Sequence, residues 1–329
     1  MDELTFKSDA LMMRTIHSND ANHQAANLIN WQQEFDQLSQ GQFVGVINEI
    51  DFPHLHTFRE QTSHSLRQQC RIENGELWLG FSTNNKSCRI NNEQSSPHQF
   101  LCRSGSQDFE LLTPDDFSIF GVVLHRSFFT GLSEQTKEEL YDSNNDGLWL
   151  NNVSVDDLHK FRQYLSLLLQ PKGINWSSKT HESILHDAVL ELLTKAQQAP
   201  VAHVSSPQRQ RIMARVQNYL TESRLKSPIT MNEICNAVHV SRRTLQYTFA
   251  QCYGISPKQY IQVIRLNQAR RMLQSNEDFQ TISDVAFNYG FFHLGQFCQN
   301  YKRLFGETPR QTLQHQSKWH RFEEIKHHH

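Results

Sequence analysis

The chain has 329 residues, of which 37% are hydrophobic and 20% charged, a composition that predicts a globular protein with two domains. No apolar stretch is long enough to cross a bilayer, so we expect no membrane partner and a cytoplasmic location. The net charge of −2 is unevenly distributed: residues 207–326 hold 17 Lys and Arg against 8 Asp and Glu, and the rest holds 15 against 26. A segment of net charge +9 beside one of −11 is typical of a DNA-binding domain joined to a domain that stays off DNA.

The N-terminal part begins with a polar segment, 1–28, which we interpret as a flexible lead-in, followed by a short helix at Trp31–Leu38. Residues 29–126 then read as a β-rich domain, because short runs rich in β-branched and aromatic residues alternate with Asn, Ser, Gly and Pro clusters. Seven strands at this spacing predict a barrel, cupin-like in shape, or a small sandwich. The expected strands are Phe43–Ile50, Leu55–Gln61, Leu66–Ile72, Leu77–Ser82, Gln99–Arg103, Phe109–Thr113 and Phe117–Leu124.

Helical periodicity follows in a segment, 127–198, that we expect to be a helical extension of this domain. Its predicted helices are Ser127–Tyr141, Val155–Gln170 and Lys179–Gln198. Two interpretations of their apolar faces remain open, packing within their own domain and a homodimer interface. A linker at 199–207, with two prolines and little hydrophobicity, comes next.

One constellation in the β-rich part could bind a metal ion. His54, His56 and Glu60 lie at strand-like spacing, and such nitrogen and oxygen ligands suit zinc, iron or manganese. The pattern resembles a fragment of a cupin metal motif, but the flanking glycines of that motif are absent and Pro53 precedes it. We therefore expect no cofactor and no metal, and we keep a metal-dependent cupin-type enzyme fused to a DNA-binding domain as the alternative function. The six scattered cysteines predict reduced thiols, and no phosphate-binding loop, dinucleotide fingerprint or nucleophile motif occurs.

The C-terminal segment, 208–326, contains the same series of helix-start and turn signals twice. We interpret His327–His329 as a purification-tag remnant and exclude these residues. Thr230 to Thr281 is a shift of 51 positions, whereas Pro257 to Pro309 is a shift of 52, so one extra residue falls near 290–292. Each copy predicts a capped short helix, a tight turn and a second helix, which is the helix-turn-helix pattern.

The second helix of the first copy begins after Ser241, its expected N-cap. Its apolar stripe must face the domain core, so its polar residues point outward. An arginine and a glutamine on an exposed helix can hydrogen-bond base edges in a major groove. The predicted DNA-binding residues of this copy are Arg242, Arg243, Gln246 and Tyr247, with Arg242 better placed for a phosphate.

In the second copy, the outward positions are Leu294, Gly295, Cys298 and Gln299, of which only Gln299 is a good base reader. Lys302 and Arg303 suit phosphates, and His293 stands at the capping position, so the predicted contacts of this copy are His293, Gln299, Lys302 and Arg303. We expect the first copy to carry most of the direct readout and the second to add affinity.

A helix over Gln259–Gln274 is predicted to join the copies at a fixed distance. Its arginines, Arg265, Arg270 and Arg271, have two open roles, namely ion pairing within the domain and contact with DNA.

This series of motifs resembles the AraC/XylS family of transcription regulators. The resemblance covers about the last 120 residues and rests on the runs 241–249, 254–257, 265–270, 285–291 and 305–309. It implies two helix-turn-helix units joined by a linker helix, with bases read at positions that match Arg243, Gln246 and Tyr247. The departures are His293, Leu294 and Gly295.

The N-terminal half is similar, more weakly, to sensory domains of that family, in the subgroup of ethanolamine-utilisation operon activators. The similarity rests on the runs 31–45 and 58–68, and it implies ethanolamine and a cobalamin as inducers. Residues that could line a ligand pocket, or simply fill the core, are Phe58, Cys70, Trp78, Phe81 and Phe120.

The sequence thus predicts an α+β, non-enzymatic, sequence-specific DNA-binding transcription regulator. Its expected partners are double-stranded promoter DNA, a second copy of the chain, a small-molecule inducer and, if it is an activator, RNA polymerase. A third hypothesis is a ligand-free DNA binder controlled by protein contacts, whose β-rich domain would be filled by large side chains.

Overall fold

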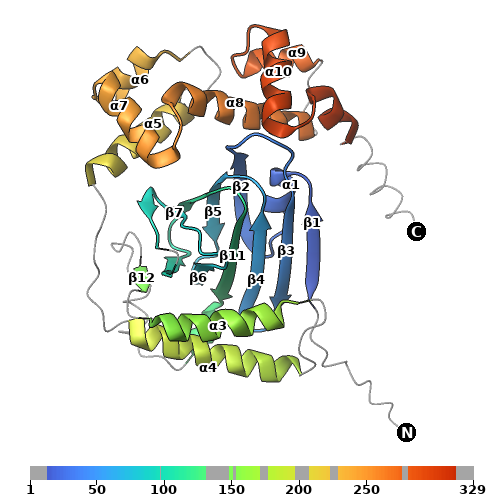
Figure 1. The fold of residues 1–329 in the computed structure, drawn as a ribbon, viewed down its shortest axis with the longest axis vertical. Helices are drawn as coiled ribbons and strands as arrows, with labels where there is room; N and C mark the ends of the chain where they lie inside the picture. The colour runs from blue at the N-terminus through green and yellow to red at the C-terminus, as the bar shows by residue number, and fades with distance from the viewer. Residues whose placement is uncertain are drawn as a thin grey trace. The chain divides into compact units, whose positions relative to one another are not determined.

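The computed structural model describes residues 13–96, 98–130, 148–150, 153–170, 177–196, 207–222, 229–275 and 281–315. It forms two compact units (Figure 1). The first comprises residues 1–35, 44–63 and 68–204, and the second comprises residues 36–43, 64–67 and 205–329. No described helix is both long and apolar enough to span a membrane.

Two antiparallel sheets dominate the first unit. The larger has the strand order β1-β3-β4-β11-β6-β9-β12, and the smaller has the order β2-β5-β10-β7-β8. The bounds are β1 (Arg14–Ser18), β2 (Trp31–Gln37), β3 (Gly45–Asp51), β4 (Leu55–Thr62), β5 (Leu66–Ile72), β6 (Leu77–Ser82), β7 (Arg89–Ile90), β8 (Glu93–Gln94), β9 (Phe100–Ser104), β10 (Phe109–Thr113), β11 (Phe117–Leu124) and β12 (Leu148–Leu150).

The α+β class is confirmed, but the closed barrel is wrong, because the described strands form two separate sheets. All seven predicted strands are present within two residues of their expected bounds. The additional strands β7, β8 and β12 have only two or three residues each, too few to produce a readable period-two pattern.

Two elements near the N-terminus correct the sequence-based assignment. Residues 31–37 form strand β2 and not a helix: Trp31, Gln33 and Phe35 are more buried than Gln32 and Glu34, which is the alternation of a strand. The expected flexible lead-in is ordered over its described part, where β1 pairs with β3 and helix α1 (Ala21–Ala25) follows.

The larger sheet carries a different core on each face. One face packs against α3 (Val155–Leu168) and α4 (Ser178–Ala196), which confirms two predicted helices (Figure 1). Leu165, Leu185 and Val189 are buried in this core, so these apolar positions are covered within their own unit. The predicted helix Ser127–Tyr141 is a short 3₁₀ turn, η1 (Arg126–Phe129), at its start, and 131–147 lie outside the described residues, as does most of the linker 199–207.

The second unit contains two helical cores that share one helix. Its helices are α5 (Pro207–Glu222), α6 (Met231–Val238), α7 (Arg242–Tyr253), α8 (Pro257–Gln274), α9 (Ile282–Asn288) and α10 (Leu294–Phe305). Helix α8 places Tyr260, Ile261 and Ile264 in the first core, and Leu266, Ala269 and Leu273 in the second. It therefore connects the two predicted modules, as Figure 1 shows.

Repeated caps explain why the helices begin and end where they do. Thr230 and Glu233 form a reciprocal capping box before α6, and Ser256 and Gln259 form another before α8. In the second copy, Thr281 accepts from the Asp284 amide at 3.1 Å. Helices α7 and α10 both end at a left-handed glycine, Gly254 and Gly306, with φ of 70° and 74°.

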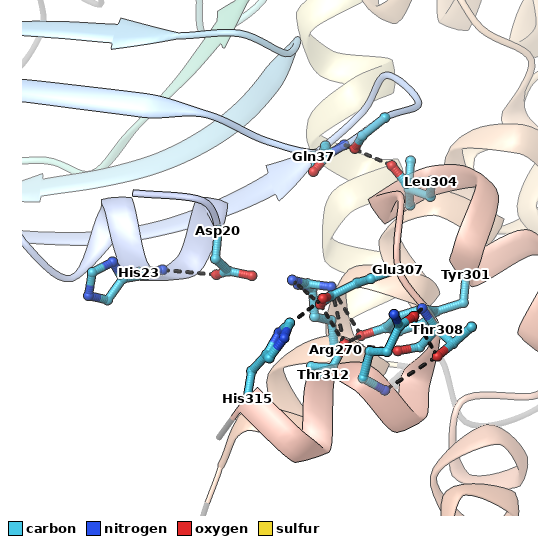
Figure 2. Close-up of polar contacts among 12 residues, drawn as sticks. Asp20, His23, Gln37, Arg270, Tyr301, Leu304, Glu307, Thr308, Thr312 and His315 are labelled. Atoms are coloured by element: carbon cyan, nitrogen blue, oxygen red, sulfur yellow. Dashed lines mark hydrogen bonds and ion pairs between the residues drawn. The ribbon is translucent and has the colours of Figure 1, made fainter. Parts of the chain in front are cut away.

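Arg270 of α8 is the buried polar centre of the second core (Figure 2). Its guanidinium pairs with Glu307 at 2.7 Å, donates to the Tyr301 hydroxyl at 3.3 Å, and stacks over the Phe305 ring at 4.6 Å. Thr312 also donates to Glu307, at 2.7 Å. The network ties α8 to α10 and to the chain that follows it, so Arg270 has a structural role.

Two short segments from the N-terminal half belong to this unit, 36–43 and 64–67. Asp36 accepts hydrogen bonds from Arg271 at 2.9 Å and from Arg67 at 3.0 Å. Gln37 donates to the Leu304 carbonyl at 2.8 Å (Figure 2). Arg271, like Arg270, is therefore paired within the unit.

Replacing Arg270 by alanine is expected to lower the opening free energy of α8 and α10 by about 3 kcal/mol, because Glu307 would lose its buried partner. Hydrogen exchange of the intact protein, read on peptides from these helices, measures this change. The exposed Lys258→Ala, on the same helix, is the control and should leave the exchange unchanged. Equal protection in both variants would contradict the structural role of Arg270.

Candidate nucleic-acid interface

Helix α7 has one buried and one exposed face. Its N-cap Ser241 accepts from the Thr244 amide at 3.1 Å, and Leu245 and Phe249 are fully buried in the first core. The opposite face is exposed and contains the four side chains predicted to contact DNA in the first copy: Arg242, Arg243, Gln246 and Tyr247. The structure thus places two guanidinium groups, one amide and one phenol on a single exposed surface.

Helix α10 is oriented in the same way by Phe297 and Tyr301, which are fully buried. The predicted contact residues of this copy, His293, Gln299, Lys302 and Arg303, are all exposed. His293 occupies the N-cap position but its side chain makes no capping hydrogen bond. Cys298 departs from the outward-facing prediction, since it is half-buried against the second core.

The turns of the two modules identify the extra residue of the second copy. Val240 donates its amide to the Cys235 carbonyl at 3.1 Å, and Phe291 donates to the Ala286 carbonyl at 2.9 Å, so Phe291 is the equivalent of Val240. The N-cap follows immediately in the first copy, at Ser241, but one residue later in the second, at His293. The inserted residue is therefore Phe292.

The exposed faces of α7 and α10 carry positive charges and no negative ones. Neither α7 nor α10 contains an acidic residue. Glu233 is engaged in its capping box, and Glu307 pairs with Arg270. Such a surface can approach a polyanion without desolvating a carboxylate of its own.

The suspected metal ligands do not converge. His54 lies before β4 and is exposed, and its Nδ1 is 2.8 Å from the Ser127 hydroxyl. His56 and Glu60 are buried on the strand, where His56 bonds Glu49 at 2.9 Å and Glu60 accepts from Gln24 at 3.2 Å. No group of three His, Cys, Asp or Glu suited to a metal ion occurs among the described residues. The metal-dependent enzyme therefore lacks the ligand set that it requires there.

The five proposed lining residues separate into the two cores that lie on opposite faces of the larger sheet. Phe81 and Phe120 belong to the core covered by α3 and α4. Phe58, Cys70 and Trp78 belong to the core between the two sheets, next to Trp31, whose ring centroid is 5.6 Å from that of Trp78. Only these three could line a site between the sheets, because side chains alternate between faces along a strand.

Polar groups are also buried between the sheets, and sequence reasoning did not identify them as a cluster. Glu60 is hydrogen-bonded by Gln24 and Gln68, but desolvation dominates and raises the pKa of its carboxyl to about 7. Burial, with the nearby Glu60 charge, also raises the pKa of the Cys70 thiol. In the sequence, Glu60 shares a strand face with His56, Phe58 and Thr62, a mixed pattern that does not mark a buried polar cluster.

Comparison with known proteins matches residues 234–315 to a helix-turn-helix domain. XylDLEGF operon transcriptional activator 1 of Pseudomonas putida is 30% identical over 141 residues, 42% of this chain and 41% of the relative. The HTH-type transcriptional activator RhaS of Escherichia coli O157:H7 (strain EC4115 / EHEC) is 27% identical over 220 residues, 65% of this chain and 76% of the relative. The crystal structure of a probable AraC family transcriptional regulator from Rhodopseudomonas palustris is 30% identical, covers 32% of this chain and 96% of that chain, and has a TM-score of 0.30.

The C-terminal unit is thus a helix-turn-helix domain, here with two such motifs. The relatives reported above, to which this chain is similar, are transcriptional activators. The chain spans about two fifths of the length of the XylDLEGF operon activator.

The buried Glu60 generates a pH prediction. Between pH 4.5 and about 7, the folded state holds more protons at this carboxyl than the unfolded state, so stability falls as the pH rises through that window. Glu60→Gln should remove this loss and stabilise the first unit by roughly 3 kcal/mol at pH 8, with little effect near pH 4.5.

Urea unfolding followed by tryptophan fluorescence, at pH 5 and pH 8, tests this expectation, since Trp31 and Trp78 lie in the same core. The exposed Glu34→Gln, from β2, serves as the control. A Glu60→Gln protein whose unfolding midpoint shifts with pH as much as that of the parent would rule out the raised pKa.

Proposed function

We propose that the protein is a sequence-specific DNA-binding transcription regulator. The observation that carries the proposal is that two helix-turn-helix modules share one helix. In each module, a fully buried apolar stripe covers one face of the second helix and leaves the opposite face exposed. Helix α8 has 18 residues and is about 27 Å long, comparable to the roughly 34 Å between successive major-groove sites on one side of a duplex. In this proposal the two modules occupy adjacent major grooves.

The first module supplies the hydrogen-bonding readout in this proposal. Arg243 and Gln246 project from the exposed face of α7, where arginine suits guanine and glutamine suits adenine. Arg242 and Tyr247 flank them and contact the backbone and neighbouring bases. In the second module, Lys302 and Arg303 contribute phosphate contacts and Gln299 is the base-reading amide.

The first unit has the regulatory role in the proposal. A small molecule or a protein contact at its β-rich core would change the activity of the DNA-binding unit, and a second copy of the chain would bind a second half-site. An activator would also contact RNA polymerase. The resemblance of the N-terminal half to ethanolamine-utilisation activators makes ethanolamine and cobalamin the first ligands to titrate against the purified protein.

Arg243→Ala should weaken binding by about 1–3 kcal/mol and relax the preference at one base position, because a bidentate contact to one base is lost. In vitro selection of duplexes with the intact protein, followed by binding measurements on single-base variants of the selected site, tests this effect. Gln299→Ala is the matched variant of the second module. If it relaxes base preference more than Arg243→Ala does, the division of labour between the modules is reversed.

Lys302→Ala should weaken binding to all duplexes alike and reduce the slope of log affinity against log salt by about 1, since one phosphate contact is lost. Binding isotherms over a series of salt concentrations provide the slope. Lys258→Ala, on α8, is the control for a general change in charge. A variant that lost affinity for only one sequence would assign Lys302 to base readout instead.

A further inference from the structure

Three exposed apolar side chains surround the start of the second recognition helix. Phe287, at the end of α9, is 49% exposed, Phe292, in the turn, is 57% exposed, and Leu294, at the start of α10, is 40% exposed. The rings of Phe287 and Phe292 are 6.5 Å apart between centroids. We call these three residues the apolar patch of the second module.

The first module has polar residues at the equivalent positions. Asn236 stands where the second module has Phe287, with a shift of 51, and Arg242 stands where it has Leu294, with a shift of 52. Phe292 is the inserted residue and has no equivalent. The apolar patch is therefore a local difference between two otherwise similar modules, located at the turn that the insertion lengthens.

The patch lies where a helix-turn-helix module meets base edges. In this motif the N-terminal residues of the second helix reach the floor of the major groove. Gly295 follows Leu294, and a Cβ added there would meet no atom within 4 Å, so no packing within the protein requires the glycine. A residue without a side chain allows the helix backbone to approach a partner closely. Lys302 and Arg303, further along the same helix, provide charge complementary to phosphates.

The chemistry of the patch selects one feature of DNA. Apolar side chains cannot replace the water that hydrates the donors and acceptors of guanine, cytosine and adenine, but they can bury the C5-methyl group of thymine. Building on the function proposed above, we propose that the second module reads thymine methyl groups through Phe292 and Leu294, with Phe287 supporting the Phe292 ring. The half-site under this module is then thymine-rich, whereas the half-site under α7 is read by hydrogen bonds.

Deoxyuridine provides the test, because it lacks only the methyl group and keeps the base pair. The intact protein is first used to select duplexes, and the positions relaxed by Arg243→Ala mark the first half-site. Thymines about one helical turn away are then replaced singly by deoxyuridine. Burying one methyl group contributes about 0.8 kcal/mol, so each contacted thymine should cost about fourfold in affinity on replacement.

The variants Leu294→Ser and Phe292→Ser should bind the thymine site more weakly, and each should become insensitive to deoxyuridine at its own position. Two measurements are the matched controls. One is binding of the intact protein to duplexes with deoxyuridine in the first half-site, and the other is binding of Arg243→Ala to duplexes with deoxyuridine in the second half-site. Gly295→Ala should weaken binding as well, although the methyl group fits without a clash in the free protein and favours the helix.

The outcomes separate the two proposals. If the intact protein retains no duplex, the DNA-binding function itself fails. If duplexes are bound but the second half-site tolerates deoxyuridine with unchanged affinity, thymine reading by the patch is overturned. Unchanged affinity combined with loss of reporter transcription in Leu294→Ser and Phe292→Ser would overturn it too, and would assign the patch to a protein partner.

Discussion

The distribution of the apolar side chains of α8 between two cores is the constraint on which the second unit depends. Tyr260, Ile261 and Ile264 anchor the first module, and the following turns of the same helix anchor the second. Each module is too small to bury a sizeable core without them, so the shared helix supplies both cores and sets their separation. The pair between the buried Arg270 and the half-buried Glu307 then fixes the second module to this helix through hydrogen bonds that a purely apolar contact would not provide.

The two modules share a fold but differ in surface chemistry. Their threonine caps before α6 and α9, their buried stripes and their C-terminal glycines coincide, so the two modules share one backbone frame. Their exposed turns differ: the first ends in a serine cap followed by two arginines, and the second ends in an uncapped histidine preceded by an extra phenylalanine. Losing a side-chain cap costs about 1 kcal/mol of helix stability. The proposed contact with DNA explains the missing side-chain cap, because the residues before α10 are then selected for what they contact outside the protein.

The core between the sheets of the first unit is more polar than stability alone would favour. Trp31, Phe58, Trp78 and Phe109 provide a cluster of aromatic rings, and Glu60 lies buried on the same strand face as Phe58. The Nε1 atoms of Trp31 and Trp78 are buried and have no hydrogen-bond partner within the described residues. Packing alone does not explain unmatched polar groups in an aromatic core.

The sequence by itself determined the α+β class, the strands from Leu55 to Leu124 and the tandem modules, because caps and hydrophobic periods are local signals. It also predicted that Arg243, Gln246 and Tyr247 would be exposed, since Leu245 and Phe249 had to be buried. Tertiary structure alone decided the rest. Strand β2 at 31–37 required a partner strand to reveal its alternation, and the separation of His54 from His56 and Glu60 depended on where the strand began. Likewise, whether Arg270 faced DNA or the core depended on Glu307, 37 positions away, and contacts between distant residues leave no local pattern.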